Sequence, residues 1–468
     1  MLFPTFSFFV FFSIVLILNW FLKRKPFLWR IFLLAISYLF YATWDIRFLA
    51  LIFLVSIFNY LGTFFIDWTI NKSYRKFWLT LIIGVDVLVL VFFKYFNFFR
   101  ESADILLNKI GFSSNALLLH IILPIGLSFY ILRAISYSVD VFNKKISLEK
   151  SFLDLAIYIS FFPQLLSGPI LRAKDFFIQL KDGGAKTIEN LEENFTLILI
   201  GLFKKIVIAS YLTVNIVDDV FTVPQNHSQL VVLLAIYAFA IVIYCDFSGY
   251  SDMAIGIAGL MGFKSPNNFA SPYLAVDFQD FWRRWHITLS NWLRDYIYIP
   301  LGGNRKGEAR TYLNLMATMF ISGLWHGTGI QFVVWSIFHG LALIISRFKA
   351  EIMNQGVTLE KILSWFITLN AVCFLWIFFR AQNLQNAFDI IKQLFNWQSL
   401  REPINVYIII LIFLSFLLFI FEQEIKEILI SIQKRLSLFS MIIFLTIIVI
   451  LIIKLGPNIV PPFIYFKF

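Results

Sequence analysis

Charged residues are scarce in this sequence: Asp, Glu, Lys and Arg make up 14% of its 468 residues, whereas apolar residues make up 60%. This composition excludes an ordinary soluble globular protein. At roughly 20 apolar residues per spanning helix, the chain has room for about ten to thirteen membrane crossings and for no sizeable soluble domain. We therefore predict an all-α, polytopic integral membrane protein in which residues 1–468 form a single transmembrane domain.

Cysteine is nearly absent as well. Only Cys245 and Cys373 occur, both within hydrophobic runs, which excludes a disulfide scaffold and a cysteine metal cluster. The sequence also has no G-x-S-x-G, H-E-x-x-H or C-x-x-C motif, so familiar hydrolase, zinc and thiol redox chemistry is disfavoured. We predict neither a metal site nor a permanently bound cofactor.

Long apolar runs dominate what is present. They lie at residues 2–22, 31–44, 48–66, 78–93, 117–139, 195–213, 229–262, 311–346, 362–379, 404–421 and 437–455. Together with re-entrant segments they predict about 11–12 transmembrane helices. The first run ends at Lys23-Arg24-Lys25 without a small-residue cleavage site, so we expect it to be a retained first helix.

The basic residues are distributed unequally between alternate loops. With an extracytoplasmic N-terminus, the inner loops 23–30, 67–77, 140–151, 172–190 and 263–310 hold 21 Lys and Arg residues, and the outer loops 45–47, 94–116 and 214–228 hold four. This asymmetry follows the positive-inside rule. It accounts for much of the net charge of +11 without a nucleic-acid partner, and it predicts the lipid bilayer as the partner instead.

The segment 281–296 is too polar to span a membrane and too aromatic for a free loop. On a helical wheel its apolar stripe comprises Phe281, Trp285, Leu289, Trp292 and Tyr296, which predicts an amphipathic helix at the inner membrane surface. Arg284, Asn291 and Asp295 fall within about 40° of each other, as a hydrogen-bonded network would require. A surface anchor with its charges in solvent is the alternative. The basic, turn-rich loop 299–307 that follows is either a phosphate contact or a solvated loop, and it does not complete a Walker motif.

The motif Trp325-His326-Gly327 interrupts the apolar segment 311–346, which is either one long helix or two helices meeting at this motif. A histidine at that depth is a candidate functional residue. We expect a neutral ring whose nitrogen accepts a proton from an attacking hydroxyl. The alternative is a structural histidine hydrogen-bonded between helices.

Two further polar segments interrupt apolar runs. The stretch 244–253 contains Asp246, Ser248 and Gly249 and is typical of broken helices that line a cavity. The stretch 167–172 places a Gly-Pro pair before Arg172, as in a re-entrant or bent segment. A kinked structural helix is the alternative for each.

Taken together, FWRRWHITLSNWLRDYIYIPLGGNRKG at 281–307 and SGLWHGTGIQFVVWSIFHG at 322–340 resemble the membrane-bound O-acyltransferase family. YCDFSGYSDMAIG at 244–256 and SGPILR at 167–172 look like the bacterial alginate O-acetylation branch of that family. The resemblance implies a bacterial inner-membrane protein with helices around a central funnel. It also implies catalytic roles for His326 and His286, with Trp325, Asn291, Arg284, Asp295, Asp246 and Ser248 as substrate-binding candidates.

The resemblance further implies an acyl thioester donor on the cytoplasmic side, such as acetyl-CoA, and a polysaccharide hydroxyl acceptor across the membrane. In related systems an extracytoplasmic, esterase-like partner protein carries the acetyl group to the glycan. His286, Asn291 or backbone N–H groups near Gly323 and Gly327 are the candidates for stabilising the oxyanion. D-alanyl transfer to teichoic acid from a carrier protein, and a transporter or flippase without enzymatic activity, are the alternative functions.

Overall fold

A computed structural model describes residues 1–110, 121–184, 189–352, 358–397, 402–403, 405–457 and 459–464. The described residues form helices and connecting segments and contain no strand, which confirms the all-α prediction. The chain divides into two compact units, Met1–Ile188 with Met261–Phe263, and Glu189–Leu260 with Lys264–Phe468. A single transmembrane domain stays a prediction.

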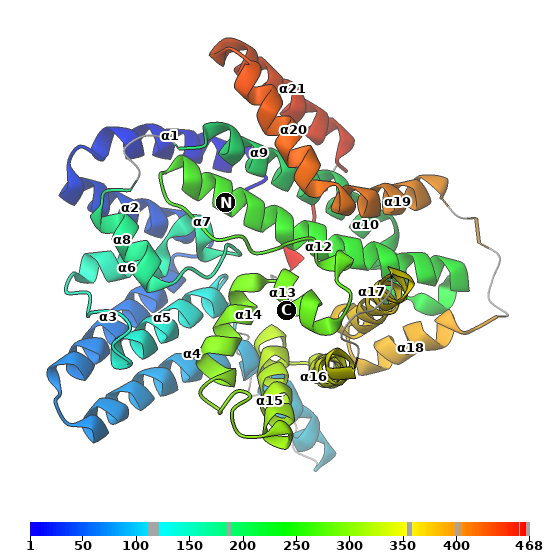
Figure 1. Cartoon of the computed structure of the whole chain (residues 1–468), viewed down its shortest axis with the longest axis horizontal. Helices are drawn as coiled ribbons and strands as arrows, with labels where there is room; N and C mark the ends of the chain where they lie inside the picture. The colour runs from blue at the N-terminus through cyan, green and yellow to red at the C-terminus, as the bar shows by residue number, and fades with distance from the viewer. Residues whose placement is uncertain are drawn as a thin grey trace. The chain divides into compact units, whose positions relative to one another are not determined.

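The first unit is formed by the first eight helices (Figure 1). They are α1 (Phe6–Leu22), α2 (Pro26–Ala42), α3 (Arg47–Trp68), α4 (Lys72–Lys109), α5 (Leu127–Phe142), α6 (Phe152–Ser160), α7 (Phe162–Leu165) and α8 (Ala173–Lys181). The chain is non-helical between α7 and α8, as the Gly-Pro pair predicts. The buried Arg133 of α5 donates hydrogen bonds to the carbonyl oxygens of Tyr158 and Gln164 at 3.3 and 2.5 Å, which satisfies helix-end carbonyls next to this bend.

The second unit begins with a helical segment that contains two π-helical stretches. Its elements are α9 (Leu191–Leu202), η1 (Phe203–Ala209), α10 (Ser210–Leu212), η2 (Thr213–Val217) and α11 (Asp218–Thr222). After η3 (Pro224–Asn226), the long helix α12 (Gln229–Leu260) packs along α9 and η1 (Figure 1). A Cβ atom at Gly249 would lie 2.7 Å from the carbonyl oxygen of Gly201, so glycines at this crossing permit the close approach of α9 and α12.

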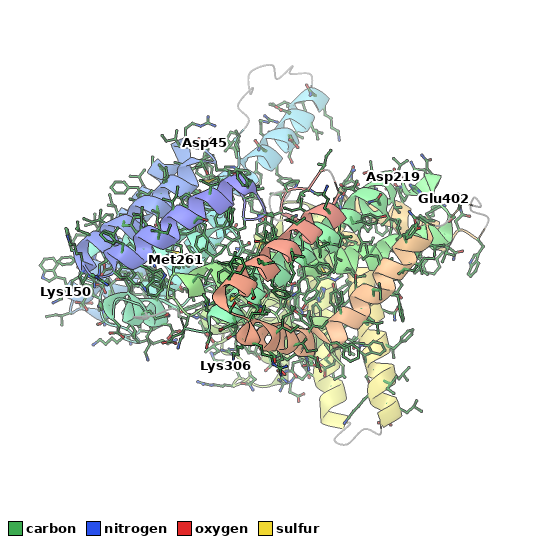
Figure 2. The ribbon with its side chains drawn as sticks, turned by 90° about the horizontal axis from the view of Figure 1, so that it is seen from above. Asp45, Lys150, Asp219, Met261, Lys306 and Glu402 are labelled. Atoms are coloured by element: carbon green, nitrogen blue, oxygen red, sulfur yellow. The ribbon has the colours of Figure 1, made fainter. Side chains whose placement is uncertain are left out.

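The remainder of the second unit carries the site. Its elements are η4 (Pro272–Leu274), α13 (Phe278–Arg284), α14 (Ile287–Leu293), η5 (Arg294–Tyr298), α15 (Glu308–His326), α16 (Ile330–Ile352), α17 (Thr358–Arg380), α18 (Leu384–Leu394), α19 (Val406–Ile420), α20 (Glu422–Arg435) and α21 (Leu438–Leu455). Figure 2 shows α16 and α17 projecting together from the rest of this unit. The segment 311–346 is therefore two helices, which meet at Gly327.

Six helices in the described part of the chain are long and apolar enough to cross a membrane, or seven if the bent pair α19 and α20 forms one span. Three further apolar helices, α1, α2 and α21, are shorter. The apolar runs lead to a higher expectation, about 11–12 helices. The difference arises because several runs form helices that are too short to be counted, such as the 17-residue α1 and α2 and the 16-residue α5.

Candidate active site

His326 is the last residue of α15, where the helix ends at an extended Gly327. Its side chain is buried, and three aromatic rings surround it. The ring centroids of Trp325, Trp335 and Phe379 lie 4.9, 5.2 and 5.1 Å from the imidazole. Because Trp335 belongs to α16 and Phe379 to α17, three helices together form an apolar enclosure around one imidazole.

Close packing of α15 on α16 holds the end of α15 in place. A Cβ atom added to Gly323 would lie 2.6 Å from Cβ and Oγ of Ser336 and 2.7 Å from the carbonyl oxygen of Phe332. Only a residue without a side chain fits at this contact. Gly323 therefore fixes the position of His326, one turn further along the helix.

His286 lies between α13 and α14 rather than within a helix. Its backbone is left-handed, with φ of 42°, so the prediction of one continuous amphipathic helix over 281–296 is wrong. The loop that precedes α13 causes the break. The N–H of Ala270 donates to the carbonyl of Arg284 at 3.0 Å, and the N–H of Ile287 donates to the carbonyl of Asn268 at 2.9 Å.

The predicted apolar stripe is nevertheless largely buried. Phe281, Trp285, Leu289 and Trp292 are buried, whereas Arg283 and Arg294 are exposed. The alternation of apolar and charged residues thus identified four of the five stripe residues as buried, and the fifth, Tyr296, is half-buried. The break was missed because it depends on hydrogen bonds to residues more than ten positions earlier in the sequence.

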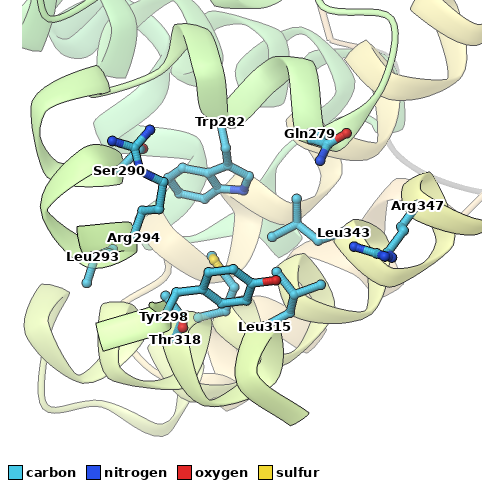
Figure 3. A pocket seen from close by; sticks show the side chains of 11 residues that line it. Gln279, Trp282, Ser290, Leu293, Arg294, Tyr298, Leu315, Thr318, Leu343 and Arg347 are labelled. Carbon is cyan, nitrogen blue, oxygen red and sulfur yellow. The ribbon is translucent and has the colours of Figure 1, made fainter. Parts of the chain in front are cut away.

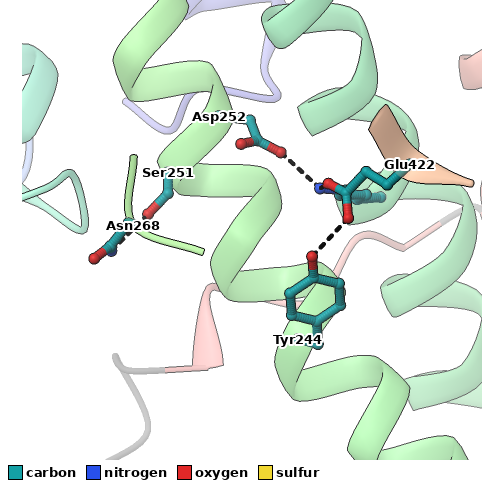
Figure 4. Close-up of polar contacts among 6 residues, drawn as sticks. Tyr244, Ser251, Asp252, Asn268 and Glu422 are labelled. Atoms are coloured by element: carbon teal, nitrogen blue, oxygen red, sulfur yellow. Dashed lines mark hydrogen bonds and ion pairs between the residues drawn. The ribbon is translucent and has the colours of Figure 1, made fainter. Parts of the chain in front are cut away.

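The side chain of Asn268 orients the imidazole of His286. Its Oδ1 lies 3.0 Å from His286 Nδ1 and accepts hydrogen bonds from the Thr288 N–H and hydroxyl at 3.3 and 2.9 Å. Its Nδ2 donates to Ser251 Oγ at 3.0 Å, a contact drawn in Figure 4. Since Oδ1 accepts from a backbone N–H, it is the amide oxygen, and His286 Nδ1 must carry a proton. The lone pair of the neutral ring is then on Nε2.

Burial lowers the pKa of His286 to about 3. The imidazole is therefore neutral at physiological pH. A neutral ring with its proton on Nδ1 accepts a hydrogen bond or a proton at Nε2 and does not donate one there.

The two histidines flank one indole. The ring of Trp325 lies 6.3 Å from the imidazole of His286 and 4.9 Å from that of His326. On its other side His286 contacts Phe247 of α12, edge to face, at 4.6 Å. The structure thus brings His286, Trp325 and His326 together, although the two histidines are 40 residues apart in sequence.

The predicted pairing of Arg284 with Asp295 is wrong. Arg284 Nε is bonded to Asp280 at 2.8 Å, and Asp295 is bonded to Arg294 Nε at 2.9 Å. A helical wheel describes one continuous helix. Because the helix is interrupted at His286, residues 287–296 no longer face the directions that the wheel gives them. In the described residues of α13, α14 and η5, Arg284 and Asp295 therefore have other partners and form no network with Asn291, which is half-buried on α14.

Asp246 and Ser248 lie on α12, which is continuous rather than broken at this point. Asp246 pairs with Lys205 Nζ of η1 at 2.6 Å, and Ser248 is buried. Six residues further along α12, Asp252 pairs with Lys204 Nζ at 2.7 Å, and Lys204 also pairs with Glu422 of α20 (Figure 4). Charged side chains between packed helices explain the polarity of this stretch without a helix break.

A cavity of about 210 Å³ opens beside α13, α14 and α15 (Figure 3). Its lining is Gln279, Trp282, Ser290, Leu293, Arg294, Tyr298, Leu315, Thr318, Met319, Leu343 and Arg347. An adjoining cavity of about 330 Å³ shares Arg294 and Arg347 and adds the loop residues Gly302, Asn304 and Arg305. Neither lining includes a histidine, but Trp282 lies 5.8 Å from Trp335, which in turn contacts His326.

In the described part of the chain, no three His, Cys, Asp or Glu side chains converge as a metal ion would require. Asn268, Trp335 and Phe379 are the site residues that the sequence patterns miss. No local pattern distinguishes Asn268 from Asn267, because the hydrogen bonds that select it are formed only in the fold.

The sequence profile of the membrane-bound O-acyltransferase (MBOAT) family matches residues 79–388. The chain belongs to this family. It is therefore an O-acyltransferase with several membrane-spanning helices, and its family match contains both histidines.

Three relatives place the chain within the MBOAT family. It is 39% identical over 373 residues to the probable alginate O-acetylase AlgI of Pseudomonas putida, covering 79% of this chain and 76% of the relative. It is 36% identical over 396 residues to the peptidoglycan O-acetyltransferase of Helicobacter pylori, with 79% and 74% covered. The similarity to the teichoic acid D-alanyltransferase of Bacillus subtilis is lower, 28% over 234 residues, with 47% and 59% covered.

Proposed function

We propose that this protein transfers an acetyl group from a cytoplasmic thioester across the bacterial inner membrane toward hydroxyl groups of an extracytoplasmic polysaccharide. The observation that carries the proposal is the pair of imidazoles on either side of Trp325. One imidazole ends a helix inside an aromatic enclosure, and the other is held by Asn268 with its lone pair on Nε2. In this proposal the first imidazole accepts a proton away from bulk water, and the second accepts a hydrogen bond.

In the proposed reaction His326 is the general base. The acceptor oxygen attacks the thioester carbonyl while its proton passes to the imidazole nitrogen. The C–S bond then breaks, and the proton passes from His326 to the leaving thiolate, so that no net proton is consumed. A positioned base of this kind contributes roughly 10²- to 10⁴-fold to the rate.

His286 has a different role in this proposal. With its proton on Nδ1 it cannot donate to an oxyanion through Nε2, so backbone N–H groups near Gly323 and Gly327 and the side chain of Asn291 remain the candidates for that task. His286 Nε2 instead accepts a hydrogen bond from the acceptor hydroxyl or from an N–H of the donor. The indole of Trp325 contacts the imidazoles of both His286 and His326.

The cavities beside α13–α15 are the proposed entry for the donor. Arg294 and Arg347 line both cavities and Arg305 lines the second, whereas the apolar side chains Leu315, Met319 and Leu343 line the first. Phosphate groups suit the arginines, and an uncharged arm ending in a thioester suits the apolar interior. Acetyl-CoA and a phosphopantetheine-bearing carrier protein share this chemistry, so both are candidate donors.

The identity of the acceptor is proposed from the relatives. The match covers about three-quarters of the length of a probable alginate O-acetylase and of a peptidoglycan O-acetyltransferase, and both names specify O-acetylation of a polymer. We therefore favour acetyl over D-alanyl transfer. An extracytoplasmic, esterase-like protein is the proposed partner that receives the acetyl group and passes it to the polysaccharide.

The test uses purified protein in lipid nanodiscs with radiolabelled acetyl thioester, together with the O-acetyl content of polysaccharide from cells that lack the native gene. We expect both His326→Ala and His326→Gln to lower transfer by at least roughly 100-fold, because an amide keeps a hydrogen bond but cannot accept the proton.

The control is His339→Gln, which replaces another buried histidine among aromatic rings and should retain activity. Substantial transfer by His326→Gln would exclude His326 as the base and transfer that role to His286. Donor binding or movement without acyl transfer by the wild-type protein would instead support a transporter.

A further inference from the structure

The C-terminal tail after α21, described at residues 456–457 and 459–464, contacts η1 and α12 of the second unit. Lys205 Nζ donates to the carbonyl of Pro462 at 3.3 Å, and the N–H of Ile464 donates to Asp246 Oδ2 at 2.8 Å. Lys205 and Asp246 are themselves paired at 2.6 Å. The ion pair between η1 and α12 therefore binds the tail backbone on both sides of Phe463.

Phe463 is fully buried. Its ring lies 4.5 Å from that of Tyr250 and 5.8 Å from that of Phe247. Phe247 in turn meets the imidazole of His286 edge to face at 4.6 Å. The side chain of Phe247 thus contacts both a ring of the tail and the histidine that Asn268 orients.

Two side chains that lie at least 18 residues from His286 in the sequence contact its imidazole. Asn268 fixes the imidazole through a hydrogen bond, and Phe247 fixes it through van der Waals contact. Aromatic pairs at these separations have defined geometry, so removal of the Phe463 ring leaves space into which Phe247 can rotate. In a closely packed interior such a change is transmitted to the next ring.

We propose that Phe463 is a positioning residue, which holds His286 in its productive orientation through Phe247, and that Lys205 and Asp246 anchor the tail that carries it. This inference rests on the proposed function, because it assumes that His286 takes part in acyl transfer. The proposal also gives Asp246 a structural role, which is to bind the backbone of the tail. The tail lies outside residues 79–388, so the family match does not include it.

The experiment compares Phe463→Ala with Phe463→Leu, which restores much of the lost volume, and with Ile459→Ala at an exposed tail position. A chain that ends at Ile459 removes the anchored residues altogether. For each variant, kcat and KM for acetyl thioester, the thermal unfolding temperature and the rate of diethyl pyrocarbonate modification at His286 are measured, the last by peptide mass spectrometry.

For Phe463→Ala and the shortened chain we expect kcat to fall at least tenfold, KM for the donor to stay within twofold, and the modification rate at His286 to rise at least fivefold. Phe463→Leu should recover most of kcat, and Ile459→Ala should behave as wild type. A simple loss of stability would instead lower the unfolding temperature and the amount of active protein, with an unchanged modification rate.

Wild-type kcat and wild-type reactivity of His286 in Phe463→Ala would overturn the proposal, as would a fall in kcat without any change at His286. Failure of the proposed function has a different signature. The wild-type protein would then turn over no acetyl thioester, while the modification rate at His286 would still report whether the tail controls this residue.

Discussion

At the scale of single residues, the hydrogen bond between Asn268 and His286 yields a prediction about pH. Asn268→Asp places a carboxylate about 3 Å from Nδ1, at the distance of the present amide oxygen, and a nearby negative charge favours the imidazolium. The pKa of His286, which burial holds at about 3, should therefore rise. As pH falls through this raised value, Nε2 becomes protonated and can no longer accept, so the variant should lose activity at a higher pH than the wild-type enzyme.

The measurement is the pH dependence of kcat from pH 5 to 9. Asn267→Asp is the matched control, because it introduces the same charge one position earlier on an exposed side chain. Profiles of the same shape for the wild type and Asn268→Asp would show that His286 does not take part in the rate-limiting step.

At the scale of elements, the contact between α15 and α16 yields a second prediction. Gly323→Ala forces a methyl group against Ser336 and the backbone of Phe332, and overpacking of this kind costs about 1–3 kcal/mol. We expect a lower thermal unfolding temperature and lower activity, because the end of α15 that carries His326 must move.

Gly84→Ala on α4 is the control, since a Cβ atom there would meet nothing within 4 Å. In the Gly323→Ala background, Ser336→Gly should restore part of the stability by removing the atoms that the methyl group meets. An unfolding temperature and activity equal to those of the wild type in Gly323→Ala alone would contradict this account.

The sequence predicted elements well where their cause is local. Apolar runs and charge spacing identified the helices, the inward faces of α13 and α14, and the motif at which α15 ends. The sequence-based prediction was wrong where hydrogen bonds to distant residues determine the backbone. At His286, for example, the helix is interrupted by backbone hydrogen bonds to Asn268 and Ala270. The prediction was also wrong at α12, where paired lysines on η1 let Asp246 and Asp252 lie within an intact helix. Neither cause leaves a periodic signal in the sequence.

At the scale of the whole molecule, the unequal distribution of basic residues predicts the orientation of the protein in the membrane. Lys306, in the loop between η5 and α15, should face the cytoplasm. A Lys306→Cys variant should react with a membrane-impermeant maleimide only after the cells are opened. The two natural cysteines, Cys245 and Cys373, are buried and should contribute little background, and Ile46→Cys in an outer loop is the opposite control. Labelling of position 306 in intact cells would reverse the orientation.

The paired charges on η1 and α12 bear on how the chain enters the bilayer during its synthesis. Each charged side chain at the centre of a lone helix costs the insertion machinery about 2.5–3.5 kcal/mol. Lys204 and Lys205 emerge from the ribosome before Asp246 and Asp252, with which they pair. The two helical segments should therefore leave the translocon together, as a hairpin whose charges are already neutralised. Glu422, the other partner of Lys204, is made more than 200 residues after that lysine, so its helix can dock only onto a hairpin that is already in place.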